Sequence, residues 1–171
     1  VHYRAAFDNF LRDFLTLELN PPRPLKLDSV YREFRMWYPA QLSDSYAQEA
    51  AAKLERMLRF GHHYCTFMFD PQSGGVAEAG LRRVQRLVDV ASPAIMVLLE
   101  RRLHDKALND QELMQALDLI ESYVLRRSMI GAETRSGGQI FAALAQRIAV
   151  DWPLARLKAA LVRQPKGAEF P

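Results

Sequence analysis

The sequence has almost no cysteine, since Cys65 is the only one among 171 residues. A single cysteine can form no internal disulfide and cannot supply a zinc site built from cysteines. This scarcity favours a reducing compartment, so we expect a cytoplasmic protein. Long apolar runs are also missing. The longest, Pro93–Leu99, is far shorter than the roughly 20 residues of a membrane-spanning helix, so we expect no membrane partner.

Several sequence signals of other protein classes are missing as well. The N-terminus lacks the basic and then apolar pattern of a signal peptide. The chain contains no Walker loop, no dinucleotide-binding glycine pattern and no Gly-x-Ser-x-Gly elbow. We therefore expect that this segment is not an enzyme and binds no cofactor.

The composition is that of a folded protein, with 49% apolar residues, 25% charged residues and a net charge of +3. We expect one helical domain over residues 1–163, with possible sub-bundles at 1–70 and 76–163. The chain opens on Val1 and closes on a tail rich in proline and glycine. We expect a segment of a longer protein in which residues 164–171 are a tail or a linker to a missing C-terminal domain.

Apolar residues recur at helical spacing throughout, and no window alternates with the two-residue period of a strand. The predicted fold class is therefore all-α, an irregular bundle of about eight helices without a sheet. Breaks and capping residues place these helices from Tyr3 to Asn20, from Asp28 or Ser29 to Trp37, from Ser43 or Asp44 to Asp70, and then from about Val76, Ser92, Asp110, Ser136 and Asp151. The residues predicted to be buried are Phe7, Phe10, Phe14, Leu98, Leu117, Ile120 and Leu144.

The third predicted helix carries apolar residues at a heptad-like spacing. We expect this stripe, which includes Cys65, to face the core, and its small residues predict close helix packing. Its members are Ala47, Ala51, Leu54, Leu58, Gly61, Cys65 and Met68.

Histidines offer two weak indications of a metal site. His62 and His63 are adjacent, but no second pair of ligands lies near them in the sequence. His104 and Asp105, with His62 or His63 before them and Asp151 after them, follow loosely the order of ligands in all-α metal phosphohydrolases. We expect instead that His104 is a surface cation near a helix C-terminus, and we predict no transition metal at these histidines.

Arginine provides 18 of the 23 basic residues. Helical spacing places Arg127 on the stripe of Ile120 and Val124 and directs Arg126 outward. We therefore predict that Arg127 reaches an acidic side chain or backbone carbonyls on a neighbouring helix. Contact with nucleic acid or another domain is the alternative. Adjacent arginines occur at Arg82 and Arg83, Arg101 and Arg102, and Arg126 and Arg127.

Arg135 precedes Ser136, Gly137 and Gly138, which lead into a predicted helix. Free backbone N–H groups at such a turn can hold an anion. An ordinary helix start accounts for the same residues.

The stretch Leu119–Ala145, LIESYVLRRSMIGAETRSGGQIFAALA, resembles the GmrSD-type restriction and anti-phage proteins, known as domain of unknown function 262. FLRDFLTL at Phe10–Leu17, followed by VYREF at Val30–Phe34, is similar to the helical region after that family's N-terminal catalytic domain. The resemblance covers most of the chain, although two glycines stand where the family has a more polar turn. Its most specific positions are Ser122, Tyr123, Arg126, Arg127 and Phe141.

Proteins of this family join a ParB-like nucleotide-hydrolysing domain, marked by Asp-Gly-Gln-Gln-Arg, to a His-Asn-His nuclease domain. This chain contains neither motif. The resemblance therefore implies a non-catalytic helical scaffold that links the two catalytic domains of a nucleotide-dependent nuclease. It implies packing and domain contact for Tyr123, Arg126, Arg127 and Phe141.

Two functions from different classes follow from the sequence. One is the scaffold, whose partners are the flanking domains of the parent protein and, nonspecifically, DNA; it predicts an uncovered apolar surface patch. The other is a stand-alone DNA-binding domain, which predicts arginines gathered on one face and an affinity that falls steeply with salt. A metal-dependent phosphohydrolase is a third and less favoured hypothesis.

Overall fold

The computed structural model describes residues 3–38, 44–85, 88–129, 134–150 and 153–162. These residues form eight α-helices and two short 3-10 helices, with no strand among them, which confirms the all-α prediction. The elements are α1 (Tyr3–Leu19), η1 (Leu27–Ser29), α2 (Val30–Trp37), α3 (Asp44–Met68), η2 (Pro71–Ala77), α4 (Glu78–Val84), α5 (Val88–Leu103), α6 (Asp110–Met129), α7 (Thr134–Ala149) and α8 (Leu154–Val162).

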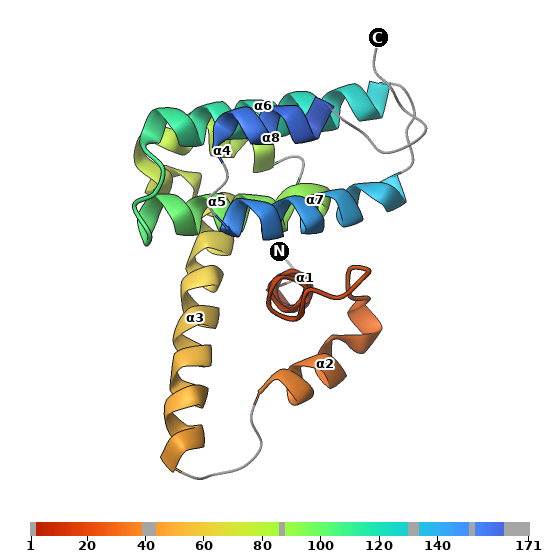
Figure 1. Ribbon diagram of the computed structural model, residues 1–171, viewed down its shortest axis with the longest axis vertical. Helices are drawn as coiled ribbons and strands as arrows, with labels where there is room; N and C mark the ends of the chain where they lie inside the picture. The colour runs from red at the N-terminus through yellow and green to blue at the C-terminus, as the bar shows by residue number, and fades with distance from the viewer. Residues whose placement is uncertain (1–2, 39–43, 86–87, 130–133, 151–152, 163–171) are drawn as a thin grey trace.

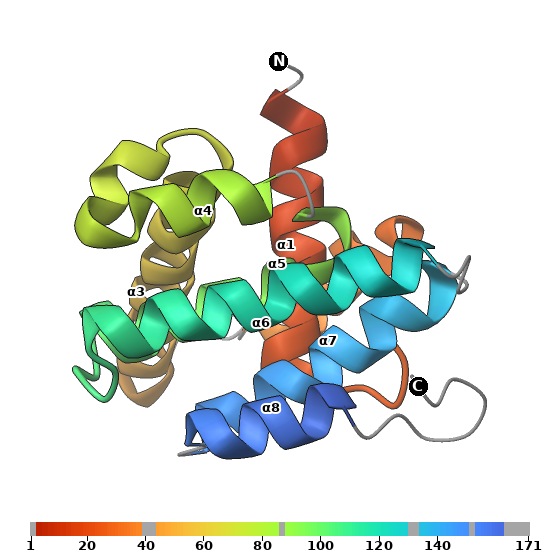
Figure 2. The same ribbon diagram turned by 90° about the horizontal axis from the view of Figure 1, so that it is seen from above.

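The helices lie in layers (Figure 1). α6 and α8 lie together in one outer layer, α5 and α7 form the middle layer, and α1 to α3 lie on the other side. α1 is seen end-on in Figure 1 and lengthwise in Figure 2, where it crosses behind α6. α3 packs against α5 near its C-terminal end and extends away from the other layers at its N-terminal end.

Local sequence signals set several helix ends. α1 ends before two prolines, and Asn20 there adopts a φ of 43° while its N–H bonds the Thr16 carbonyl at 3.2 Å. α6 begins with a capping box: the Glu112 N–H donates to Asn109 Oδ1, and the Asn109 N–H donates to Glu112 Oε2, each at 2.9 Å. The residue that caps α6 is therefore Asn109.

Two helices begin earlier than the sequence predicts. α5 starts at Val88, so Ser92 and Pro93 lie inside it. The Ser92 hydroxyl does not cap a helix but donates to the buried carboxylate of Asp13 on α1, which also pairs with Arg12 at 2.7 Å. α7 likewise starts at Thr134, ahead of the predicted Ser136.

α5 is the central helix, as its apolar composition predicts. Every side chain from Ala91 to Arg101 is buried. The prediction that Phe7 is buried is wrong, because 53% of its surface is exposed. The others are confirmed: Phe10, Phe14, Leu98, Leu117, Ile120 and Leu144.

The face of α3 that packs on the core is not the predicted one. Phe60, His63, Tyr64 and Phe67 are buried, and Phe60 contacts Phe14 of α1 with ring centroids 5.7 Å apart. These residues also recur at helical spacing, and the larger aromatic rings bury more apolar surface than the smaller residues of the heptad stripe. The predicted stripe is left at the surface, with Ala47, Ala51, Leu54, Leu58 and Cys65 exposed.

Candidate functional site

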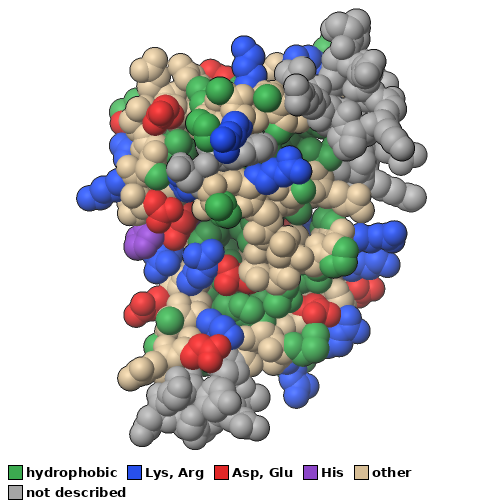
Figure 3. Space-filling model, viewed as in Figure 1, with side chains coloured by type: hydrophobic (Ala, Val, Ile, Leu, Met, Phe, Trp, Pro, Cys, Tyr) green, Lys and Arg blue, Asp and Glu red, His purple; other side chains and the backbone are tan. Residues whose placement is uncertain are grey.

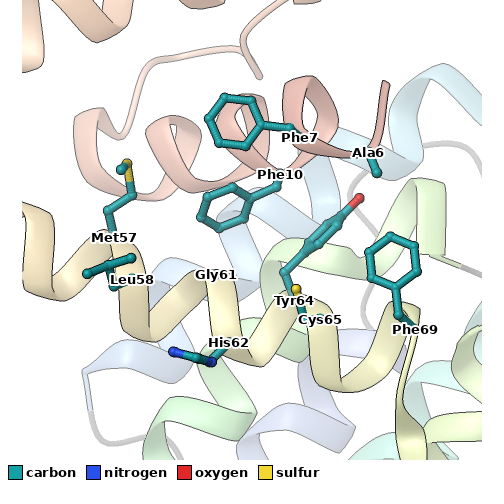
Figure 4. A pocket seen from close by; sticks show the side chains of 10 residues that line it. All are labelled: Ala6, Phe7, Phe10, Met57, Leu58, Gly61, His62, Tyr64, Cys65 and Phe69. Atoms are coloured by element: carbon teal, nitrogen blue, oxygen red, sulfur yellow. The ribbon is translucent and has the colours of Figure 1, made fainter. Parts of the chain in front are cut away.

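An apolar groove of about 340 Å³ lies between the N-terminal part of α1 and α3 (Figure 4). Three large side chains on its walls are exposed: Phe7 on α1, Leu58 on α3 and Phe69 just after α3. We name this feature the α1/α3 groove. Its lining residues are Ala6, Phe7, Phe10, Met57, Leu58, Gly61, His62, Tyr64, Cys65 and Phe69.

Aromatic packing forms the floor of the groove. Phe10 is buried and lies between Phe7 and Tyr64, with ring centroids 6.2 Å and 5.5 Å away. Gly61 lies against it, and a Cβ atom there would make an ordinary contact of 3.6 Å with Phe10 Cζ. The floor is therefore fixed by contacts within the protein, while the walls remain open.

The position of α3 explains why Phe7 is exposed. Phe10 and Phe14 are covered by Tyr64 and Phe60 of α3. Phe7 lies one turn nearer the start of α1, where its ring contact is with Phe10 of the same helix. The helical stripe of α1 is thus longer than the surface that α3 covers, and the surplus forms a wall of the groove.

Two residues of the family-like motif hold α6 against α7. Tyr123 and Phe141 are both fully buried, and their rings meet edge to face with centroids 5.7 Å apart. Such a pair adds to the stability from burial alone. The pair therefore belongs to the packed interior between α6 and α7.

The arginines of the motif lie at the edge of this pair. Arg127 is half-buried, with its guanidinium 5.8 Å from the Tyr123 ring centroid and its Nη1 3.4 Å from the Tyr123 hydroxyl. Arg126 is exposed, and its Nε donates to the Ser122 carbonyl at 3.1 Å. Arg135 lies in α7, but its side chain falls outside the described residues. The structure therefore brings Tyr123, Phe141 and Arg127 into contact and leaves Arg126 at the surface.

The two adjacent histidines differ in burial and in their contacts. His62 is exposed on the α1/α3 groove, and Cys65, which we expected in the core, is exposed there too. His63 is buried, and its Nε2 lies 2.7 Å from Oε2 of Glu100. Asp151, the last residue of the order that loosely follows the all-α phosphohydrolases, lies outside the described residues.

Sequence reasoning missed Glu100. It lies in the last turn of α5, is buried, and holds the imidazole of His63 on one oxygen and Arg59 on the other, the latter at 3.4 Å. Its spacing of four residues from His104 was the available signal, because such pairs share one face of a helix.

Burial determines how His63 titrates. Its surroundings disfavour the charged imidazolium, which lowers the pKa of His63 below its usual 6.5. The hydrogen bond and the charge of Glu100 raise this pKa, but they only partly offset the desolvation. His63 is therefore neutral near neutral pH, and its Nε2–H donates to the Glu100 carboxylate.

Most described arginines with a defined partner lie in ion pairs. Arg83 pairs with Asp118 and Glu121, and its hydrogen bond to Glu121 raises the pKa of the Arg83 guanidinium. Figure 3 shows basic and acidic side chains interspersed over the face in view. Further pairs join Arg56 to Glu18, Arg82 to Glu78 and Arg102 to Asp110, at 2.6, 2.7 and 2.6 Å.

Comparisons with known proteins identify no relative. The chain matches no protein-family model, no curated protein and no solved structure at a significant level. Within the described residues, no helix combines the length and apolarity that crossing a membrane requires.

Proposed function

We propose that this chain is a non-catalytic helical interaction module whose α1/α3 groove receives the apolar face of a helix from another domain of the same parent protein. The observation that supports this proposal is an uncovered apolar groove whose floor is packed and whose walls are exposed. Contiguous apolar surface of this kind is typical of interaction sites, whereas isolated exposed apolar residues are ordinary.

The spacing of the residues along the uncovered stripe of α3 favours a helix as the occupant. Leu54, Leu58, Gly61 and Cys65 follow one another at intervals of four, three and four along α3. Alternating intervals of three and four are the pattern by which one helix packs lengthwise on another. Since no described helix covers this stripe, a helix from outside these residues would complete it. Helix-in-groove binding uses the same i, i+3, i+4 and i+7 anchors.

Charge pairing supports coupling between domains over DNA binding. A DNA-binding surface needs basic side chains that are available to phosphate. Arg56, Arg82, Arg83 and Arg102 instead lie beside carboxylates of the same chain. Carboxylates of the same chain therefore compete with phosphate for these side chains.

The parent that we propose is a GmrSD-like restriction or anti-phage protein, on the strength of the sequence resemblance alone. In that setting the module would link a nucleotide-hydrolysing domain to a nuclease domain. The packed Tyr123 and Phe141 pair agrees with a structural role for the shared motif. The parent's nucleotide and nuclease chemistry would lie in the flanking domains.

Site-specific crosslinking tests the proposal in the full-length parent protein. A photoreactive amino acid replaces Leu58, which is 61% exposed, and the crosslinked peptides are identified by mass spectrometry. We expect crosslinks to a helix of a flanking domain. The matched control is Met129, which is 85% exposed at the end of α6 and lies outside the groove. Position 129 should not give the same crosslinks.

A charge in the groove provides the functional test. Leu58→Asp should change the free energy of unfolding of this segment by less than about 0.5 kcal/mol, because the side chain is already exposed. In the parent protein it should abolish the contact between the α1/α3 groove and the helix of the flanking domain. Crosslinks only between two copies of this segment, or none at all, would show that no flanking helix occupies the groove.

A further inference from the structure

The end of α5 brings together three side chains that can bind a metal ion. Within the described residues, one ligand atom each of Glu100, His104 and Asp105 lies within 4.8 Å of the other two. Glu100 and His104 are four residues apart and so share a helix face. The turn that positions them is ordered by hydrogen bonds, because the N–H groups of His104 and Asp105 bond the Glu100 carbonyl at 2.9 and 3.1 Å.

The chain then turns sharply away. Lys106 adopts a φ of 54°, and the Ala107 N–H closes back on the Arg101 carbonyl at 2.8 Å. This αL closure ends the helix and leaves His104 and Asp105 exposed beside Glu100. The two exposed ligands are accessible from solvent, and the third is anchored in the protein.

The Glu100 carboxylate is held in place by a residue of a second helix. Only 6% of its surface is exposed, and His63 from α3 donates to its Oε2 at 2.7 Å. Hydrogen bonds from a neighbouring residue orient metal-binding carboxylates in the same way. Because α3 and α5 both contribute, the orientation of Glu100 is fixed by the tertiary fold and not by one helix.

The electrostatics of the site favour a cation. Two carboxylates and one imidazole converge at the C-terminal end of α5, where the helix dipole is negative. Ligands of one tetrahedral zinc site lie about 3.3 Å apart at metal–ligand distances of about 2.0–2.1 Å. The exposed His104 and Asp105 side chains would rotate to close the remaining distance. Contrary to the sequence-based prediction of no metal at His104, we propose that Glu100, His104 and Asp105 bind a divalent transition-metal ion of the zinc type and leave a fourth position to water.

Arg59 is the natural competitor of the metal ion. Its Nε lies 3.4 Å from Oε1 of Glu100, and the side chain is 36% exposed. The guanidinium therefore supplies positive charge to Glu100 in the absence of a metal and has open solvent to move into when a metal arrives. Removal of Arg59 should strengthen metal binding, whereas removal of a ligand should weaken it.

Titration of the metal-free protein with zinc chloride, followed by calorimetry, tests this site. We expect equimolar binding and, with cobalt in place of zinc, the visible absorption of a four-coordinate ion. His104→Ala and Asp105→Asn should each weaken zinc binding by more than about tenfold, and His63→Leu by about tenfold through loss of the group that orients Glu100. Asp28→Asn is the matched control, because Asp28 is also an exposed carboxylate, lies in η1 and should leave zinc binding unchanged.

Arg59→Ala distinguishes zinc binding at Glu100 from nonspecific zinc binding at the surface. The proposal predicts that this variant binds zinc more tightly than the unaltered protein, with an unchanged circular dichroism spectrum as the check on folding. Zinc binding that is absent at millimolar concentration, or that survives both His104→Ala and Asp105→Asn, would overturn the site. Failure here would leave the α1/α3 groove untouched, since none of these ligands lines it.

Discussion

The imidazole of His63 and the carboxylate of Glu100 join α3 to α5 through a buried hydrogen bond, with 2.7 Å between Nε2 and Oε2. Because Nε2 faces an acceptor, the proton of neutral His63 resides there. This relationship makes the stability of the protein sensitive to pH.

The sign of that sensitivity follows from burial. Desolvation lowers the pKa of folded His63 below 6.5, so the unfolded chain takes up a proton first as the pH falls. The stabilising contribution is present above pH 6.5 and is lost as the pH drops toward the folded pKa. In metal-free protein, the free energy of unfolding should therefore fall as the pH is lowered from about 7 through 6.5 and below. Denaturant unfolding of His63→Gln, which keeps a donor but does not titrate, should show a shallower fall over this range.

Arg127 and Arg126 should differ in stability. Arg127→Ala removes a half-buried guanidinium from the Tyr123 ring and should cost about 1 kcal/mol. Arg126→Ala removes an exposed side chain and should cost less than about 0.5 kcal/mol. Thermal unfolding of both variants provides the measurement. Equal losses would mean that the contact with Tyr123 contributes nothing.

The contact between Tyr123 and Phe141 should stabilise the fold more than the contact between Arg127 and Tyr123 does. Phe141→Ala creates a cavity beside a fully buried ring and should cost about 3–5 kcal/mol. Tyr123→Phe keeps the ring and should cost about 1 kcal/mol or less. Denaturant midpoints distinguish the two. A large loss in Tyr123→Phe would instead assign the stability to the hydroxyl and its bond with Arg127.

The helices could be predicted because their signals are local. Prolines after α1, the Asn109 cap of α6 and the apolar run of α5 each act within a few residues. The start of α5 was missed because Ser92, a typical capping residue, bonds Asp13 on a distant helix. Tertiary contact overrode the local preference.

The residues of the candidate site could not be predicted from helical periodicity, because periodicity does not show which face of a helix is buried. α3 has two helical stripes, one with Leu58 and Cys65 and one with Phe60 and Phe67, and only packing against α1 and α5 decides which is buried. The same choice exposes Phe7 and creates the groove. Glu100 was missed for a similar reason, because its partner His63 lies on another helix and the sequence does not show their contact.

Two glycines in helices should respond oppositely to alanine. A Cβ at Gly61 would meet Phe10 at an ordinary 3.6 Å, so Gly61→Ala should stabilise by about 0.5–1 kcal/mol through helix propensity. A Cβ at Gly80 would lie 3.0 Å from both Leu117 Cδ1 and Met114 Sδ. Since Leu117 is fully buried, Gly80→Ala should instead destabilise by about 1 kcal/mol. Melting temperatures of the two variants give the comparison. Stabilisation by both would mean that α4 and α6 can separate at no cost.

The affinity of the protein for DNA separates the two functions that the sequence left open. The ion pairs of the arginines should restrict double-stranded DNA binding to the nonspecific range, with a Kd of about 10⁻⁴–10⁻⁶ M at physiological salt. Fluorescence anisotropy with a labelled duplex measures this affinity at several salt concentrations.

Releasing one arginine provides the internal test. Asp118→Asn combined with Glu121→Gln removes both carboxylates that pair with the exposed Arg83. If charge pairing is what limits DNA binding, the double variant should bind more tightly, and its plot of log affinity against log salt should steepen by about 0.9 for one added phosphate contact. Asp28→Asn changes the net charge at an exposed position where no arginine is paired among the described contacts, and it should leave the slope unchanged. Nanomolar binding by the unaltered chain, with a slope of many phosphate contacts, would favour the DNA-binding domain over the interaction module, because paired arginines could not supply that many contacts.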